Sequence, residues 1–310
     1  MTGSPYRDSS LFTDRSPYTD LERPPLNRRA LERALITPGG LWTRLDLRPE
    51  TGSTNADAAQ AARAGEPAGL LVVAERQTAG RGRRDRGWHS PARAGLATSV
   101  LLRPGEANPA RGWPAAPPTT YGWLPLLAGV ALAEAVVRLT ELDAVLKWPN
   151  DLLVGGAKCG GILAEAVPNP DPGSPPSIVL GVGLNVTLRP DELPANPTGL
   201  PATSLKLAGA EMTDRDPLLR ALLRGLADWY DRWRRAAGDP QACGLRAAYL
   251  RNCATVGRRV RVLLPAGDEL VGTATGVDLD GQLVVKTDGG ERTVAAGDVL
   301  HVRGQPDPED

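Results

Sequence analysis

The stretch Lys147-Trp-Pro-Asn-Asp-Leu-Leu-Val-Gly-Gly-Ala-Lys-Cys-Gly-Gly161 places two lysines among short apolar runs and turn-forming glycines. The whole chain has four lysines, and arginine supplies its other permanently cationic side chains. Lysine carries a compact ammonium on a flexible stem, which the planar guanidinium of arginine does not imitate. Lys147 and Lys158 therefore mark a candidate site, with two ordinary solvated lysines as the alternative.

The segments on either side of this stretch predict a sheet covered by helices. Short apolar runs separated by Gly, Pro and Asn are typical of strands, and longer runs with a helical period are typical of helices. The predicted strands are residues 41–47, 70–77, 95–103, 144–148, 152–154, 162–167 and 178–186, and the predicted helices are 26–35, 53–65, 124–139 and 216–235. In this layout the catalytic candidates lie between strands.

Smaller signals refine this layout. Thr54 and Asp57 have the spacing of a capping box at the start of the second helix. Trp148 is expected in the core, because tryptophan is mostly buried in proteins. The Pro-rich residues 104–120 predict an irregular surface insertion.

The C-terminal part of the chain has a different pattern. Several short strands are predicted between residues 258 and 303, broken by Gly267, Gly272, Asp280-Gly281 and Gly289-Gly290. Such spacing is typical of a small all-β module of the SH3-like barrel type, with Asp280-Gly281 as a hairpin turn. Residues 1–25, rich in Ser, Pro, Asp, Arg and Thr, lack apolar periodicity and predict a disordered tail.

The composition favours a protein of the cytoplasm. With 310 residues and 41% hydrophobic side chains, the chain can bury a full core and add a second small domain. Its 36 basic and 36 acidic side chains cancel, so no overall field attracts nucleic acid or a membrane. Three cysteines form no disulfide framework, and neither a signal sequence nor a long apolar span is found. We expect no DNA and no membrane partner.

A second candidate site is the loop Gly80-Arg-Gly-Arg-Arg-Asp-Arg-Gly-Trp88. Glycines let the backbone approach a ligand closely, and arginines offer forked donors to phosphate or carboxylate oxygens. RNA-binding Gly/Arg repeats and plain solvated loops have similar compositions. The position between two predicted core strands, with Trp88 available to stack or close a pocket, favours an anion-binding loop.

Five motifs occur together in one order and spacing: Ser53-Thr54-Asn55, Glu75 to Arg84, Lys147 to Asp151, Lys158 to Leu163 and Gly181 to Asn185. Together they resemble the biotin protein ligases, over residues 42–303. The resemblance implies an α+β fold with the mixed-sheet catalytic domain shared by biotin and lipoate ligases and a small C-terminal SH3-like β-barrel. It implies the domain division 26–254 and 255–303, with tails at 1–25 and 304–310.

The resemblance implies a two-step ligase reaction. The carboxylate of biotin attacks the α-phosphate of ATP, and a lysine of a carrier protein then attacks the resulting biotinyl-5′-AMP. The cofactors implied are ATP and Mg²⁺, and the partners are biotin carboxyl carrier domains of acyl-CoA and pyruvate carboxylases. Such chemistry needs preorganised cations rather than a protein nucleophile. With only His89 and His301, an extended histidine metal site is not expected.

The site residues are carried over by the same resemblance. Lys158 and Arg83 are expected to be catalytic. The biotin contacts are expected to be Ser53, Thr54, Asn55, Gln77, Arg81, Gly82, Arg83 and Lys158. The nucleotide contacts are expected to be Arg81, Arg84, Trp88, Lys147, Asn150, Asp151 and Asn185, with Asp151 also a ligand of Mg²⁺. Capping roles for Thr54, Asn55 and Asp151 and solvation of Gln77 at a strand end are the structural alternatives.

One position departs from the family pattern. Asp85 stands where many relatives carry glycine, so the loop gains a negative charge, although Asp tolerates a positive φ better than most residues. Two other functions stay open: a lipoate or octanoate ligase, and a biotin-responsive repressor that binds DNA. The single helix predicted before the ligase domain argues against a recognition unit for DNA. A homodimer formed through a sheet edge is a further candidate assembly.

Overall fold

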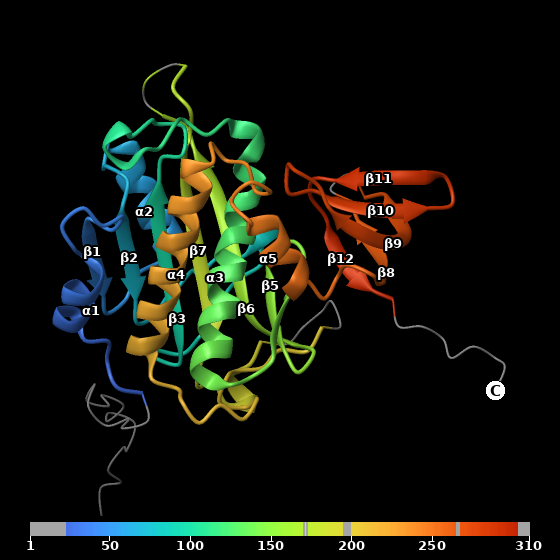
Figure 1. The fold of residues 1–310 in the computed structure, drawn as a ribbon. Coiled ribbons are helices and arrows are strands. Elements are labelled where there is room, and N and C mark those ends of the chain that lie inside the picture. The colour runs from blue at the N-terminus through green and yellow to red at the C-terminus, as the bar shows by residue number, and fades with distance from the viewer. Residues whose placement is uncertain (1–22, 170, 172, 195–199, 265–266, 303–310) are drawn as a thin grey trace, which may run out of the picture.

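Seven strands form the larger sheet, in the order β1-β2-β3-β7-β6-β5-β4 (Figure 1). The computed structural model describes residues 23–169, 171, 173–194, 200–264 and 267–302. The strands are β1 (Arg44–Arg48), β2 (Leu70–Ala74), β3 (Gly95–Leu102), β4 (Ala144–Lys147), β5 (Asp151–Val154), β6 (Ala157–Val167) and β7 (Ser177–Asn185). β1 and β2 are parallel and the remaining pairs are antiparallel, so the sheet is mixed.

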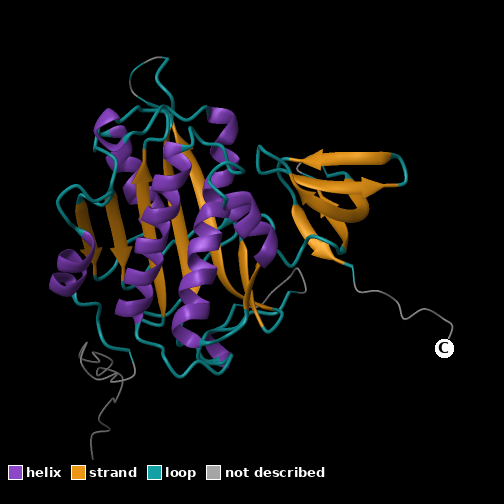
Figure 2. Cartoon of the chain, in the orientation of Figure 1, coloured by secondary structure: helices purple, strands orange, loops and turns teal. Residues whose placement is uncertain are grey.

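Both faces of the sheet carry helices, and β2 is buried on both of its sides. In β2, Leu71 and Val73 pack into the main core, whereas Leu70 and Val72 pack against the alanines of a single helix. That single helix is α2 (Thr54–Arg63). The other face carries α1 (Arg28–Leu35), α3 (Trp123–Thr140), α4 (Arg215–Arg235) and α5 (Leu245–Asn252) (Figure 2). The fold is therefore α+β, as the resemblance implies.

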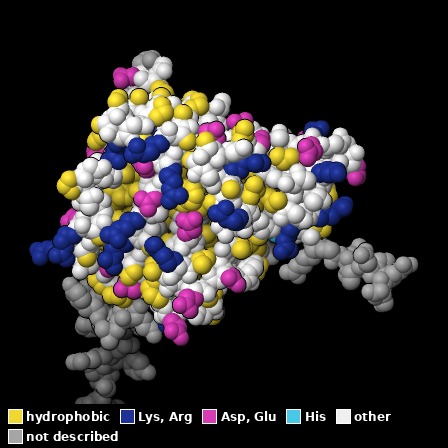
Figure 3. Space-filling model, in the orientation of Figure 1, with side chains coloured by type: hydrophobic (Ala, Val, Ile, Leu, Met, Phe, Trp, Pro, Cys, Tyr) yellow, Lys and Arg dark blue, Asp and Glu magenta, His cyan; other side chains and the backbone are white. Residues whose placement is uncertain are grey.

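α3 is the central core helix. Together with the preceding 3-10 turn it is long and apolar enough to cross a membrane. Thirteen of its eighteen residues are buried against the sheet and the neighbouring helices, which accounts for an apolar sequence on nearly every side. On the face formed by α3 and α4, basic and acidic side chains are interspersed (Figure 3), in keeping with the balanced composition.

A second, antiparallel sheet follows α5. Its strands are β8 (Arg259–Leu263), β9 (Glu269–Val277), β10 (Leu283–Thr287), β11 (Gly290–Val294) and β12 (Asp298–His301), in the order β11-β10-β9-β8-β12. This is the SH3-like module expected from the sequence, and Gly281 takes a left-handed φ of 82° in the β9–β10 turn. The indoles of Trp123 and Trp148 donate to the carbonyls of Leu279 and Gly281 at 2.8 and 3.1 Å. These bonds dock the small domain on the large one.

Several sequence predictions about local structure were wrong. Lys158 and Asp151 lie inside β6 and at the start of β5 rather than between strands. Ser53, not Thr54, is the N-cap of α2, because its hydroxyl accepts from the Ala56 amide at 3.4 Å. Helix α5 was not predicted. Its sequence has no clear apolar periodicity, and packing against α3 and β4 stabilises it instead.

The predicted N-terminal tail was assigned too long. Residues 1–22 and 303–310 lie outside the described part of the chain. Arg23, inside the predicted tail, is only 6% exposed and donates to the Thr187 carbonyl at 2.8 Å. It also pairs with Glu192 at 2.5 Å. The Pro-rich insertion contains two 3-10 turns, Pro109–Arg111 and Pro118–Gly122.

Candidate active site

A row of small residues crosses the middle of the larger sheet. The strand register aligns Lys147, Asp151, Gly161, Gly183 and Ala97 from β4 through β5, β6 and β7 to β3. Residues paired in register project from the same face of a sheet. The glycines and the alanine therefore form a low floor, and the charged pair Lys147 and Asp151 stands at one end of it.

The N-terminus of α2 forms a polar wall beside this floor. The Asn55 side chain is 5% exposed and accepts from the Ser99 hydroxyl at 2.6 Å. Its amide donates to Glu165 at 2.6 Å and to the Leu163 carbonyl at 3.3 Å. A Cβ on Gly181 would lie 2.0 Å from Asn55 Oδ1, so only glycine fits there. Buried polar groups held in this way have one fixed orientation.

Gln77 completes this wall. Its Oε1 accepts from the Thr54 amide at 2.8 Å and from the Thr54 hydroxyl at 3.1 Å. The Ser99 hydroxyl lies 2.8 Å from Thr54 Oγ1. Ser53, Thr54, Asn55 and Gln77, which are distant in sequence, are thus brought together around one end of the floor.

Lys158 reaches the other end of the floor because of a β-bulge. The register between β5 and β6 shifts between Leu152 and Leu153, which places an extra residue on β6. Cys159 turns into the core, and Lys158 comes to lie on the same face as Gly161. Its Nζ is 2.6 Å from Asp151 Oδ1 in an ion pair. The bulge thus aims the ammonium into the site.

Asp151 holds both lysines of the opening stretch. Lys147 Nζ lies 3.7 Å from Asp151 Oδ2. Burial lowers the pKa of the Lys147 ammonium, and the charge of Asp151 opposes this change. Two ammonium groups around one carboxylate leave a net positive charge, which is suited to binding an anion.

Backbone hydrogen bonds within the Gly/Arg loop hold its two ends together. The Gly82 amide donates to the Arg86 carbonyl at 2.6 Å, and the Trp88 amide donates to the Gly80 carbonyl at 2.8 Å. Arg81 pairs with Glu165 at 3.2 Å. Arg83 donates to Asn150 Oδ1 at 3.4 Å, and burial lowers the pKa of its guanidinium. The loop and the sheet therefore share the same polar side chains.

One residue of the loop has a left-handed backbone, which the sequence did not predict. Arg84 adopts the left-handed conformation, with φ 53° and ψ 47°. The side chain of Asp85 lies outside the described part of the structure.

Trp88 lies against the floor, since a Cβ on Gly183 would be 2.5 Å from its indole. Lys158 Nζ is 5.9 Å from the centre of that ring.

These elements surround a cavity of about 1130 Å³. Nearly all of the residues predicted from the sequence line it: Ser53, Thr54, Asn55, Gln77, Arg81, Gly82, Arg83, Trp88, Lys147, Asn150, Asp151, Lys158 and Asn185. Arg84 does not line it and instead reaches the C-terminal domain. Asn185 is held there by donating to the Thr203 carbonyl at 2.9 Å.

Sequence reasoning missed the contribution of the C-terminal domain to this cavity. Residues 298–302 of β12 and its end form part of the wall. His301 faces Thr255 at 3.2 Å, and burial together with Lys147 and Arg258 lowers the pKa of its imidazole to about 4. Glu165, which holds Asn55 and Arg81, was also missed. A single glutamate in an apolar strand is too weak a signal to single out.

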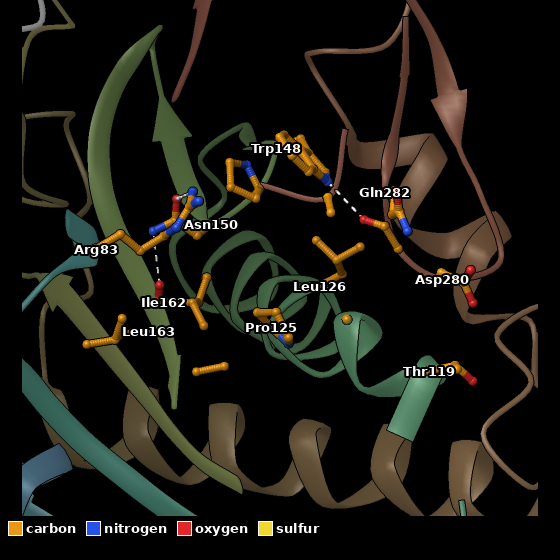
Figure 4. Close-up of a pocket in the computed structure, with 15 residues that line it drawn as sticks. Arg83, Thr119, Pro125, Leu126, Trp148, Asn150, Ile162, Leu163, Asp280 and Gln282 are labelled. Atoms are coloured by element: carbon orange, nitrogen blue, oxygen red, sulfur yellow. Dashed lines mark hydrogen bonds between the residues drawn. The ribbon is translucent and has the colours of Figure 1, made fainter. Parts of the chain in front are cut away.

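A smaller cavity of about 390 Å³ adjoins the main one between the two domains (Figure 4). Arg83 and Asn150 lie at one side of it, and Trp148 and Gln282 at another. Arg83 and Asn150 also line the main cavity, so they form a shared wall. Asn150 is fixed there by donating to the Ile162 carbonyl at 3.0 Å.

A covalent mechanism through cysteine has no support in this site. Burial raises the pKa of the Cys159 thiol to about 12, and its sulfur lies 3.4 Å from the Asn185 carbonyl. A thiol in that state is a poor nucleophile at neutral pH. The arrangement instead places cations and fixed donors around a long trough.

The residues present fit Mg²⁺ only as a partner of bound phosphates. In the described part of the chain, no group of three or more His, Cys, Asp or Glu side chains could hold a metal ion. Mg²⁺ often binds through one or two carboxylates and completes its shell with substrate phosphates and water. Asp151 Oδ1 is engaged by Lys158, but Oδ2 has only the looser contact with Lys147. One carboxylate oxygen is thus available.

Comparisons with known proteins agree with this geometry. The model of the biotin/lipoate A/B protein ligase family matches residues 51–185, and that of the biotin protein ligase C-terminal domain matches residues 255–302. The chain is 42% identical to the biotin--[acetyl-CoA-carboxylase] ligase of Mycobacterium tuberculosis, over 94% of this chain and 100% of that protein. It is 32% identical to the bifunctional ligase/repressor of Escherichia coli, over 71% of this chain and 63% of that protein.

A solved structure has the same fold. The biotin protein ligase of Aquifex aeolicus, in complex with biotin and ATP, matches with a TM-score of 0.64 and 26% identity. The match covers 85% of this chain and 100% of that one. The motifs, both sheets and the identity over nearly the full length lead to one conclusion. The chain belongs to the biotin protein ligase family.

Proposed function

We propose that the protein attaches biotin to a specific lysine of a biotin carboxyl carrier domain, using ATP and passing through biotinyl-5′-AMP. One observation carries the proposal. A trough floored by Gly161, Gly181 and Gly183 runs from a fixed polar wall to the ammonium of Lys158 and the Gly/Arg loop. It can hold a flat polar ring at one end and a carboxylate at the other.

The polar wall suits the ureido ring of biotin. Thr54, Asn55 and Gln77 offer donors and acceptors whose orientation is fixed by Ser99 and Glu165. A site built to hydrogen-bond a polar ring discriminates against an apolar analogue, which cannot make those hydrogen bonds. The dithiolane ring of lipoate and the alkyl chain of octanoate lack such groups, so biotin is favoured.

Lys158 and Arg83 act on the reacting atoms. In the first step an oxygen of the biotin carboxylate attacks the α-phosphorus of ATP, and pyrophosphate leaves. Negative charge grows on the α-phosphoryl oxygens, which fixed cations stabilise. In the second step the amine of the carrier lysine attacks the mixed anhydride, and AMP leaves. The same two cations hold the leaving phosphate.

The nucleotide lies towards β4 and the C-terminal domain. Lys147, Asn150, Asp151 and Asn185 line that end of the cavity, with Trp88 and Arg81 at the loop. Asp151 Oδ2 is the protein ligand offered to Mg²⁺, which lowers the charge repulsion of the phosphates when it is bound. The domain division 26–254 and 255–303 puts the nucleotide at the domain boundary.

The carrier domain approaches the free edge of β6. Within the described residues, β5 pairs with β6 only as far as Gly161. Beyond Gly161, β6 carries the small, exposed side chains of Ala164 and Ala166. An unpaired edge accepts another strand, from a carrier domain or a second copy of the chain. Carboxylases for acyl-CoA and pyruvate are the proposed carriers, and the cytoplasm is the proposed location.

A repressor function has less support. The described residues before β1 contain one helix, α1, which packs on α4 and cannot form a helix-turn-helix by itself.

Pyrophosphate release from MgATP tests the proposed activity, with biotin, lipoate or octanoate as the only acid. Release that depends on biotin is the expected result. Release with lipoate or octanoate alone would assign the protein to the sister activity. No release with any of the acids would refute a ligase function.

A further inference from the structure

Asp298 joins the Gly/Arg loop to the C-terminal domain. This carboxylate, the first residue of β12, is 18% exposed. Its Oδ2 lies 3.1 Å from Arg84 Nη1, and its Oδ1 lies 2.8 Å from Arg86 Nη2. Arg84 also donates to the carbonyl of Leu263, which is the register partner of Asp298 on β8. Two arginines of the loop thus converge on one pair of residues in the other domain.

The same contacts hold the loop in a strained shape. Arg84 has a left-handed backbone, which costs a non-glycine residue about 1–2 kcal/mol. Such a conformation persists where the surrounding contacts enforce it. The side chain of Arg84 makes two contacts with the C-terminal domain, and Arg83 adds a third by donating to the Gly297 carbonyl at 3.3 Å. The contacts at Asp298 therefore select the closed shape.

The arginines of the loop divide into two pairs. Arg81, Arg83 and Arg86 line the main cavity, and Arg81 and Arg83 contact Glu165 of β6 and Asn150 of the β4–β5 turn. Arg84 and Arg86 both pair with Asp298, across more than 200 residues of sequence. The two arginines that pair with Asp298 thus anchor the loop, while Arg81 and Arg83 face the cavity without contacting Asp298.

We propose that Asp298 is a positioning residue that clasps the Gly/Arg loop shut over the site and sets how long the acyl-adenylate intermediate stays bound. The part that concerns the intermediate rests on the proposed function. The clasp itself does not, because it consists of the ion pairs between Asp298 and the two arginines. Asp298 lies at the edge of the main cavity, and its two ion pairs with Arg84 and Arg86 position the loop.

Trypsin digestion of the ligand-free protein tests the clasp directly. The substitution Asp298→Asn keeps the size of the side chain and removes its charge. Each partly exposed ion pair contributes up to about 1 kcal/mol, so losing two should speed cleavage after the loop arginines about tenfold. Asp298→Glu keeps the charge and should restore much of the protection. Asp288→Asn, an exposed aspartate of the same domain, is the matched control and should cleave like the wild type.

Escape of the intermediate tests the functional part. Enzyme loaded with radiolabelled biotin and ATP is chased with unlabelled biotin, and free biotinyl-adenylate is measured over time. Asp298→Asn should release it about tenfold faster, and Asp298→Glu should restore much of the retention. A loop cleaved at the wild-type rate would overturn the clasp. Faster cleavage with unchanged escape would overturn its role in retention. Absence of any intermediate in the wild type would count against the proposed function, while the digestion would still decide the clasp.

Discussion

Replacing Gly181 by alanine should displace the Asn55 side chain from the polar wall of the site. A Cβ at this position would lie 2.0 Å from Asn55 Oδ1 and 2.9 Å from its Cγ. The Asn55 side chain cannot turn away cheaply, because it is buried and bonded to Ser99, Glu165 and the Leu163 carbonyl. Overpacking of a buried site costs about 1–3 kcal/mol. Each hydrogen bond lost adds about 1 kcal/mol, and more where a carboxylate accepts.

We therefore expect Gly181→Ala to lower the free energy of unfolding by about 3 kcal/mol and to weaken biotin binding at least about tenfold, which corresponds to about 1.4 kcal/mol. Differential scanning calorimetry measures the first effect, and isothermal titration with biotin alone measures the second. Gly276→Ala is the control, since nothing lies within 4 Å of a Cβ there. Unchanged biotin affinity in a folded Gly181→Ala protein would refute the placement of biotin against Asn55.

Three further substitutions test the charged end of the site. Lys158→Ala should slow adenylation about 10²–10³-fold, with little loss of stability because Lys147 still pairs with Asp151. The control Lys286→Ala should change neither the adenylation rate nor the stability, and single-turnover kinetics measure the rate for both variants. Asp151→Asn should slow adenylation and raise the Mg²⁺ concentration needed for the half-maximal rate. An unchanged Mg²⁺ dependence would exclude Asp151 as a ligand of Mg²⁺ and leave it only the role of positioning Lys158. The pKa of His301 is about 4 in the folded protein and about 6.5 in an unfolded chain, so the unfolded state binds more protons between these values and stability falls as the pH falls through that window. His301→Gln should therefore lose less stability than the wild type between pH 7 and about pH 5 in urea unfolding, and an equal loss would contradict the burial of neutral His301.

The sequence contained enough local information to predict most of the fold. Apolar runs gave the strands because their residues pack on both faces of the sheet, as in β2. Trp148 was correctly expected in the core, where it is 1% exposed. Helix α5 was missed because its stability comes from tertiary packing, which a short segment does not reveal.

The candidate site was predictable only in part. Its motifs lie within short stretches, so most of their residues could be named from the sequence. The bulge that brings Lys158 and Gly161 onto one face depends on strand register, and register is set by pairing rather than by local composition. Asp298 and His301 come from another domain, and no local pattern connects them with the loop. Glu165 becomes recognisable only through its two partners, Asn55 and Arg81.

The most direct test of the central claim is the intact mass of an apo biotin carrier domain after incubation with the protein, biotin and MgATP. We expect the addition of one biotinyl group, dependent on both biotin and ATP and abolished when the acceptor lysine of the carrier is replaced by arginine. A carrier that stays unmodified here, yet is labelled by an authentic biotin ligase under the same conditions, would contradict the account.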